Sequence, residues 1–181
     1  MDEGRSRILD VLSAFTGREG EPKNEIESYT LKAMWLMMLS EFEASVKEKT
    51  ENYIDQIKKR NIADIHICLL IRNFYGDSKE ELTLNRVISC FKKNPREISY
   101  RNFTQDRVPK YKSQAVKKLF NSMGVFFAED EETLLAVLDS VASTRDSIAH
   151  GDIGIEITRK QLEEQLQKLS ELTKMLGSKL A

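Results

Sequence analysis

The sequence predicts an all-α fold, a bundle of about five to seven helices arranged around one long central helix. Three observations support this prediction. Apolar residues recur at intervals of three and four along most of the chain, as they do on the buried face of a helix. The 181 residues include only eight Gly and three Pro, too few for the many tight turns of a β-sandwich or barrel. Hydrophobic residues make up 40% of the chain, so we expect residues 1–181 to form a single domain with its own core.

The N-terminal part of the chain predicts two helices. Residues 5–16 carry apolar side chains at helical spacing, and the glycines at positions 17 and 20 end this element. A long helix from Glu25 to Arg60 follows, and residues 33–39 within it are apolar on every side. Such a segment is typical of the central helix of a bundle or of a helix at a dimer interface. Its broad apolar stripe comprises Ile26, Tyr29, Met34, Trp35, Met38, Leu39, Phe42 and Val46.

The middle of the chain has weaker patterns. Residues 64–75 alternate like a strand and also fit a helix, and we predict a helix because no second strand lies nearby in the sequence to pair with it. Residues 80–93 predict another helix. Residues 94–112 contain two prolines and no periodicity, which predicts a loop.

The C-terminal part predicts three further helices. The first spans residues 113–123 and is capped by a glycine at position 124. Three consecutive acids at 130–132 open the next helix, where the helix dipole favours negative charge. That helix is expected to run to about residues 149–150 and to stop at Gly151. Thr158 caps the last helix, which has a single apolar face of Leu162, Leu166, Leu169, Thr173, Leu176 and Leu180.

The net charge of −1 excludes a protein that binds nucleic acid through bulk positive charge, so such binding requires a local patch. Residues 92–118 provide one, with nine bases, two acids and interleaved aromatic residues. Bases neutralise phosphates and aromatic rings stack on unpaired nucleobases. The alternative is a solvated loop pinned to the core by its aromatic residues. The candidate RNA-binding residues are Arg96, Tyr100, Arg101, Arg107, Lys110, Tyr111 and Lys112.

Other signals predict a cytoplasmic protein without a cofactor. The N-terminus lacks a basic start followed by an apolar stretch, and no apolar run is long enough to cross a membrane. Cys68 and Cys90 lie in apolar helical contexts, as expected for reduced, buried thiols. His66, in an apolar run, is expected to be a core or interface residue. We find no metal-ligand cluster, Walker loop, dinucleotide fingerprint or nucleophile elbow.

The most distinctive motif is Arg145-Asp146-Ser147-Ile148-Ala149-His150, followed by Gly151. Side chains five apart on an ideal helix point roughly 140° away from each other. Arg145 and His150 therefore cannot face one substrate unless the helix ends between them or a second copy supplies the other half. Asp146 is four residues before His150 and lies on the same face, where it is positioned to accept a hydrogen bond from the imidazole. The carboxylate and the helix C-terminus should both favour imidazolium.

This segment, STRDSIAHG at 143–151, resembles the motif of the HEPN superfamily (higher-eukaryote and prokaryote nucleotide-binding domains). Two more segments, LMMLSEFE at 36–43 and LFNSMG at 119–124, are similar to single-domain prokaryotic members. Many such proteins are metal-independent endoribonucleases of toxin–antitoxin, abortive-infection or antiviral systems, and others only bind nucleotides or RNA. In active members two protomers pair so that both motifs face one cleft.

The resemblance implies that Arg145 and His150 are catalytic and that Asp146 is the usual polar neighbour. Members that are silenced by nucleotidylation carry a Tyr two positions after the His, whereas this chain has Asp152 there and offers no such target. The predicted function is therefore a homodimeric, metal-independent endoribonuclease, with an antitoxin or defence protein as a possible partner. Two alternatives stay open: a non-catalytic HEPN module that binds RNA, nucleotide or protein, and a helical interaction protein. In the second, Arg145 forms an interhelical salt bridge and His150 caps a helix.

Overall fold

The computed structural model describes residues 2–14, 20–59, 112–152 and 154–181, and every regular element in these ranges is a helix. The predicted all-α fold is therefore confirmed. The helices expected at 64–75 and 80–93 lie outside the described residues, as does the expected loop except for Lys112. The described helices are α1 (Asp2–Ser13), α2 (Glu25–Lys59), α6 (Ser113–Ser122), α7 (Glu129–Leu135), α8 (Val137–Ala149) and α9 (Arg159–Lys179).

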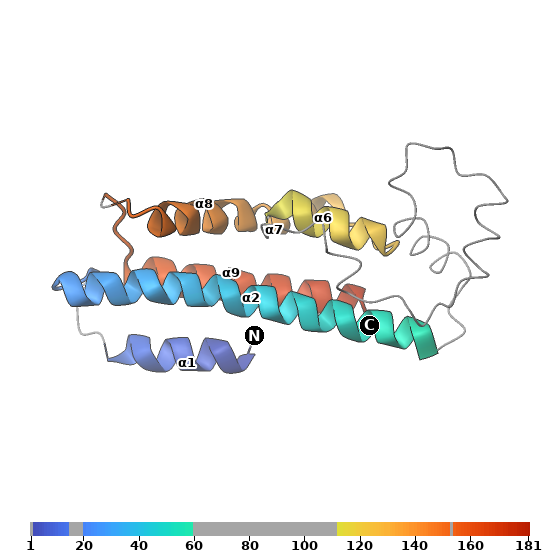
Figure 1. The fold of residues 1–181 in the computed structure, drawn as a ribbon, viewed down its shortest axis with the longest axis horizontal. Helices are drawn as coiled ribbons and strands as arrows, with labels where there is room; N and C mark the ends of the chain where they lie inside the picture. Colours follow the sequence, from blue (N-terminus) through green and yellow to red (C-terminus); the bar gives the residue numbers. More distant parts are fainter. Residues whose placement is uncertain (1, 15–19, 60–111, 153) are drawn as a thin grey trace.

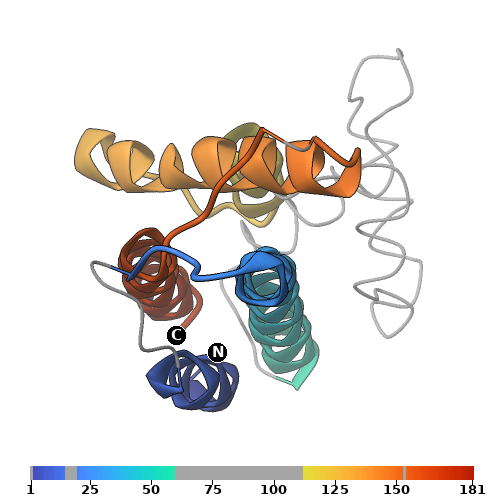
Figure 2. The same cartoon turned by 90° about the vertical axis from the view of Figure 1, so that its left-hand side faces the viewer.

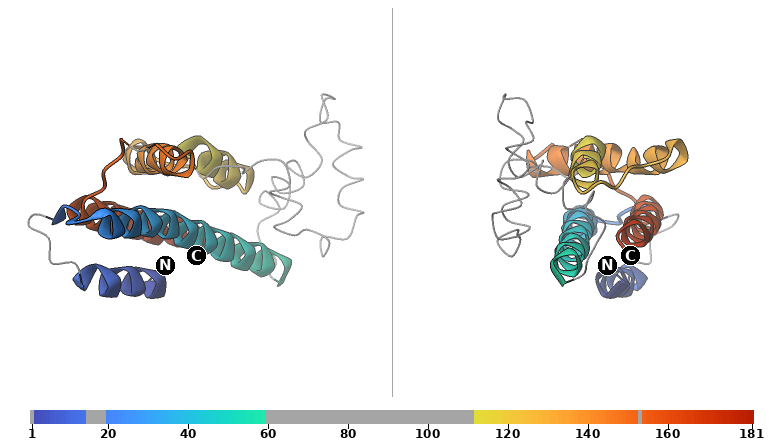
Figure 3. Two further views of the ribbon diagram at one scale, coloured as in Figure 1. Left: turned by 60° about the vertical axis from the view of Figure 1, so that its left-hand side comes forward. Right: turned by 90° about the vertical axis from the view of Figure 1, so that its right-hand side faces the viewer.

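The described helices form two layers (Figures 1 and 3). In one layer α2 and α9 lie side by side and run in the same direction, and α1 packs against both of them in the opposite direction. In the other layer α7 and α8 cross over α2 and α9, while α6 contacts α8 and runs nearly along α2. Figure 2 shows that α8 extends past α2, so the C-terminal end of α8 protrudes from the side of the bundle. Of the described helices, none has both the length and the apolar character needed to cross a membrane.

The hydrophobic core lies between the two layers and α1. All six residues of the apolar face predicted for α9 are buried, and so is most of the stripe predicted for α2. Two members of that stripe contradict the prediction, because Ile26 is 78% exposed and Tyr29 is 70% exposed. The reason is that α1, α8 and α9 cover only one side of α2. Met37, from the segment that is apolar all round, is also exposed, on the side of α2 that none of the described helices covers.

The helix ends agree closely with the predicted caps. Thr158 accepts a hydrogen bond from the backbone N–H of Gln161 at the start of α9. After α6, Gly124 has φ +78° and its N–H donates to the carbonyl of Asn121, as in a Schellman motif. The prediction of a single helix from residue 130 to 149–150 is wrong in one respect, because the structure has two helices there, α7 and α8, which meet at Ala136. There the N–H of Asp139 bonds to the carbonyl of Ala136, three residues back, so the turn is tighter than an α-turn.

Lys179 connects the end of α9 to the start of α7. Its ammonium group contacts a carboxylate oxygen of Glu131 at 2.6 Å, donates to the carbonyl of Phe126 at 2.9 Å and lies over the Phe127 ring. The same Glu131 oxygen accepts the N–H of Ala128 at 2.7 Å, which caps α7. The hydrogen bond from Lys179, followed by that from Ala128, lowers the pKa of Glu131 below its ordinary value of 4.5.

We expect Glu131→Gln to lower the melting temperature at pH 7 by about 2–4 °C, the shift that about 1 kcal/mol produces in a chain of this size. A carboxyl group whose pKa is lower in the folded state stabilises the fold above its unfolded pKa, and this contribution is lost on acidification. The difference between wild type and variant should therefore shrink as the pH falls below 4.5. Thermal melts from pH 3 to 7 measure this, with Glu129→Gln on the same helical turn as the control. A difference that does not depend on pH would contradict the assignment.

Candidate active site

The Arg145–His150 motif occupies the last turn of α8, at the end that protrudes past α2. The helix stops where the sequence predicts, because Gly151 adopts φ +76°, a conformation that favours glycine. The Gly151 N–H donates to the carbonyl of Ile148, and the Asp152 N–H donates to the carbonyl of Ser147, both at 3.1 Å. These two bonds form a Schellman motif that fixes the backbone on both sides of His150.

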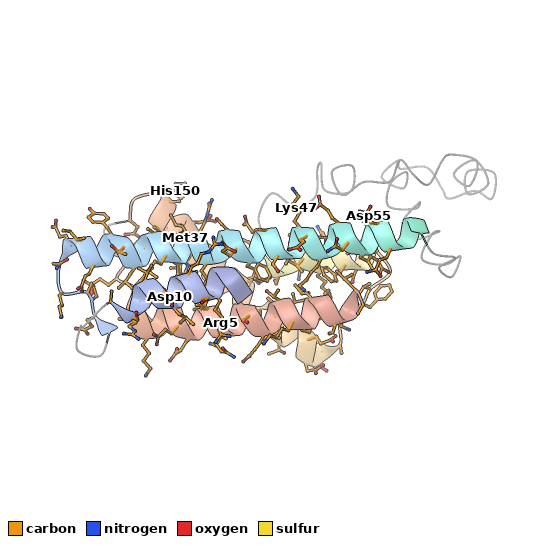
Figure 4. All side chains as sticks on the ribbon, turned by 90° about the horizontal axis from the view of Figure 1, so that it is seen from below. Arg5, Asp10, Met37, Lys47, Asp55 and His150 are labelled. Atoms are coloured by element: carbon orange, nitrogen blue, oxygen red, sulfur yellow. The ribbon has the colours of Figure 1, made fainter. Side chains whose placement is uncertain are left out.

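His150 is exposed at the C-cap position of α8. Its φ and ψ of −83° and 2° lie in the bridge region rather than the helical region, but its N–H still makes the helical hydrogen bond to the carbonyl of Asp146, at 3.0 Å. The helix therefore ends too late to turn His150 towards Arg145, and the two side chains leave α8 in different directions, roughly 140° apart. In Figure 4 His150 lies beyond the edge of α2. A single chain thus presents the two groups separately.

Arg145 is 48% exposed and forms an ion pair with its neighbour Asp146, with 3.2 Å between the guanidinium nitrogen and the carboxylate oxygen. Asp146 is partly buried, so it is a fixed partner rather than a freely solvated one. The Asp146 carboxylate accepts from a terminal nitrogen of the guanidinium, Nη1, and about half of the Arg145 side-chain surface is exposed. The predicted contact between the Asp146 carboxylate and the His150 ring stays a prediction.

Glu43 on α2 is a candidate positioning residue near Arg145 that the sequence alone does not identify. Its half-buried carboxyl group has a pKa above the ordinary value of 4.5 because burial disfavours the charged form, and the positive charge of Arg145 partly opposes this rise. The carboxyl group of Glu43 on α2 is therefore close enough to Arg145 on α8 for the two charges to attract each other. The only feature of the sequence that could have pointed to Glu43 is its position directly after Phe42, which puts a carboxylate at the edge of the apolar stripe of α2. Perturbed carboxyl groups of this kind are concentrated at functional sites.

Trp35 holds α2 and α8 in register near the motif. Its indole N–H donates to the backbone carbonyl of Val141 at 3.1 Å, and the side chain is buried. Val141 lies one helical turn before Arg145, so this bond attaches the motif-bearing part of α8 to α2. From the sequence alone, Trp35 is expected only to be a core residue.

Of the seven candidate RNA-binding residues, only Lys112 lies within the described residues, where it occupies the N-cap position of α6. Two other residues of the basic stretch, Lys117 and Ser113, connect α6 to the neighbouring helices. Lys117 forms an ion pair with Glu132 of α7, and Ser113 donates from its N–H and its hydroxyl to the Asp139 carboxylate of α8 at 3.0 and 2.5 Å. Among the residues with described positions, no group of three His, Cys, Asp or Glu side chains is arranged to hold a metal ion. His66, Cys68 and Cys90 lie outside the described ranges.

Comparison with known proteins assigns the chain to a family. A family model described as RiboL-PSP-HEPN matches residues 5–181. The comparison with curated proteins gave no match, and neither did the comparison with solved structures. The chain therefore belongs to the HEPN superfamily, as the motif at 143–151 suggested. Its particular family is the RiboL-PSP-HEPN family.

We expect Glu43→Gln to separate stability from activity. Because the pKa of Glu43 is raised in the folded state, its charge opposes folding above that pKa, so the neutral variant should be as stable as wild type at pH 7 or more stable. In the RNA-cleavage reaction that is proposed below, loss of the charge that faces Arg145 should nevertheless lower the rate, by up to about 100-fold for a misplaced positioning group. Thermal melts and initial cleavage rates measure the two effects. Glu48→Gln, at an exposed position on α2, is the control, and equal losses of stability and activity would contradict the role of Glu43.

Proposed function

We propose that this protein is a cytoplasmic, metal-independent endoribonuclease whose active site uses Arg145 and His150. The observation that carries the proposal is the exposed Arg145–His150 motif at a rigidly capped helix end, in a chain that belongs to the HEPN superfamily. RNA contains its own nucleophile, the 2′-hydroxyl group, so a site with one acid–base group and one cation suffices for cleavage.

The chemistry follows from these two side chains. The 2′-oxygen attacks the adjacent phosphorus while the neutral imidazole of one His150 accepts the hydroxyl proton. The bond from phosphorus to the 5′-oxygen breaks, and a protonated imidazole donates a proton to that leaving oxygen. The planar fork of Arg145 stabilises the extra negative charge on the pentavalent phosphate. The products are a 2′,3′-cyclic phosphate and a 5′-hydroxyl end.

We further propose that the active form is a homodimer, since Arg145 and His150 leave one helix in different directions. Two histidines at a shared cleft can then divide the base and acid roles. The basic residues at 92–118 would deliver single-stranded RNA to this cleft, and a toxin–antitoxin or antiviral role follows from the resemblance to HEPN proteins. The alternative is a HEPN module that binds RNA, nucleotide or a protein partner without cleaving RNA, which is consistent with the pairing of Arg145 by Asp146.

The test is cleavage of single-stranded RNA in the presence of EDTA. We expect cleavage to proceed without divalent metal and to leave 2′,3′-cyclic phosphate ends, identified by mass spectrometry or by their resistance to direct 3′-ligation. Activity that appears only after Mg²⁺ or Mn²⁺ is added would contradict the mechanism. RNA binding without cleavage would favour the non-catalytic module.

A further inference from the structure

The carboxylate of Asp139 on α8 fixes the start of α6. One of its oxygens accepts the backbone N–H of Ser113 at 3.0 Å, and the other accepts the Ser113 hydroxyl at 2.5 Å. The first N–H groups of a helix have no partner within the helix, and a carboxylate is a favourable partner for them. Because both carboxylate oxygens bind one residue, this Asp139–Ser113 contact restrains the orientation of Ser113 as well as its position.

Lys112 directly precedes the Asp139–Ser113 contact. Its backbone is extended at the N-cap position of α6, and its side chain is partly exposed. Within the described part of the chain no acid forms an ion pair with Lys112, whereas Lys117 is paired with Glu132. Since Asp139 holds Ser113, α8 sets the place of Lys112 on the surface. Lys112 is thus a cation at a defined position, where it is available to an anionic ligand.

Asp139 and His150 project from the same side of α8. They are eleven residues apart in the sequence. At about 100° per residue, this separation is about 20° more than three full turns, and at about 1.5 Å per residue it is about 16 Å along the helix axis. In Figure 1 α6 and α8 extend away from each other, so α8 carries His150 away from the start of α6. The Asp139–Ser113 contact therefore sets the distance between Lys112 and the candidate acid–base group.

We propose that Asp139 is a positioning residue for RNA, which acts by fixing Lys112 at this distance from His150. This inference rests on the proposed function and adds a length requirement for the substrate. At about 3.4 Å per nucleotide in a stacked strand, about five nucleotides span 16 Å. A strand of that length or longer contacts Lys112 through a phosphate while another of its phosphates lies at His150. A dinucleotide cannot reach both residues, so its cleavage does not depend on Asp139.

Three substitutions distinguish the contact from the charge of Asp139. Asp139→Ala removes both, and Ser113→Ala removes the hydroxyl bond but retains the charge. Asp139→Asn removes the charge but retains an acceptor for the Ser113 N–H and a donor for its hydroxyl. For a single-stranded octanucleotide, we expect KM to rise about tenfold in Asp139→Ala, about threefold in Ser113→Ala and hardly at all in Asp139→Asn. The value of kcat, and kcat/KM for a dinucleotide, should stay at the wild-type level, because the lost interaction is remote from the reacting phosphate.

Initial rates with both RNAs measure these constants, and fluorescence anisotropy with the 2′-O-methyl octanucleotide, which lacks the nucleophile, measures binding without cleavage. Asp130→Ala, at an exposed position on α7, removes the same charge and is the matched control. Thermal melts establish that each variant is folded at the assay temperature.

The results that would overturn the inference differ from those that would overturn the proposed function. Equal losses on both RNAs, or an asparagine variant as impaired as the alanine variant, would leave Asp139 with a structural role alone. Tighter binding of the octanucleotide by Asp139→Ala would show that Asp139 only repels phosphate. If the wild type binds the octanucleotide but cleaves neither RNA, the proposed function is wrong, and the affinities of the variants still decide the role of Asp139. A wild type that binds no RNA overturns both.

Discussion

His150→Ala should abolish RNA cleavage, lowering the rate by about 10²–10⁴-fold, the usual contribution of a general acid–base group. The fold should be unaffected, because the ring is exposed and alanine retains the backbone N–H that bonds to Asp146. Gly151, which sets the turn after α8, is unchanged. Initial rates on a fluorescent RNA under single-turnover conditions measure the loss, and the affinity for the same RNA, measured by anisotropy, should change little.

Ser140→Ala, at an exposed polar position on α8 outside the basic stretch, serves as the control and should cleave at the wild-type rate. His150→Asn retains hydrogen bonding without proton transfer at neutral pH and should be as inactive as the alanine variant. A His150→Ala protein that cleaves normally would exclude the proposed chemistry. Loss of RNA binding together with cleavage would indicate instead that His150 only contacts the phosphate.

Mixing two inactive variants should restore activity if the cleft is shared between subunits. Arg145→Ala should lose about 10²–10³-fold in rate, as enzymes do when a donor to a developing oxyanion is removed. When it is mixed with His150→Ala, random exchange makes half of the dimers heterodimers, and each of these has one arginine and one histidine from different chains. One functional pair in half of the dimers sets an upper limit of about a quarter of the wild-type rate by symmetry. If two histidines divide the base and acid roles, the absence of the second histidine lowers the recovered rate below this limit. Cleavage rates before and after subunit exchange in a 1:1 mixture measure the recovery.

The control for this experiment is a mixture of Arg145→Ala with the double variant R145A/H150A, which should remain inactive. A mixture of the two single variants that remains inactive after exchange, confirmed by native mass spectrometry of heterodimers, would show that each chain uses its own pair of groups. In that case the proposal of a cleft shared between two subunits would be wrong.

Helix positions in the described ranges could be predicted because their causes are local. Thr158 and Gly151 act through the backbone of one turn, and the leucine face of α9 follows from spacing alone. The division at Ala136 could not be predicted, because no proline or glycine marks it. The exposure of Ile26 and Tyr29 could not be predicted either, since it depends on which side of α2 the other helices cover.

The same distinction applies to the candidate site. Arg145 and His150 belong to one short segment whose residue types and spacing indicate the motif, so the sequence alone identifies them. Glu43 and Trp35 are about a hundred residues away in sequence and reach α8 only through the packing of two helices. A single sequence contains no information about which residue of α2 faces which turn of α8. Interactions across helices are therefore what the structure adds to the motif.

The hydrogen bond from Trp35 to Val141 has a thermodynamic consequence for the proposed dimer. Trp35 on the inner side of α2 attaches the motif helix, while Met37, two residues later, is exposed on the outer side. An RNA that binds across both copies must strengthen the dimer by the same factor by which dimerisation strengthens RNA binding, because coupled equilibria are reciprocal. The cellular concentration of the chain then becomes a regulator of its affinity for RNA, without any further control element.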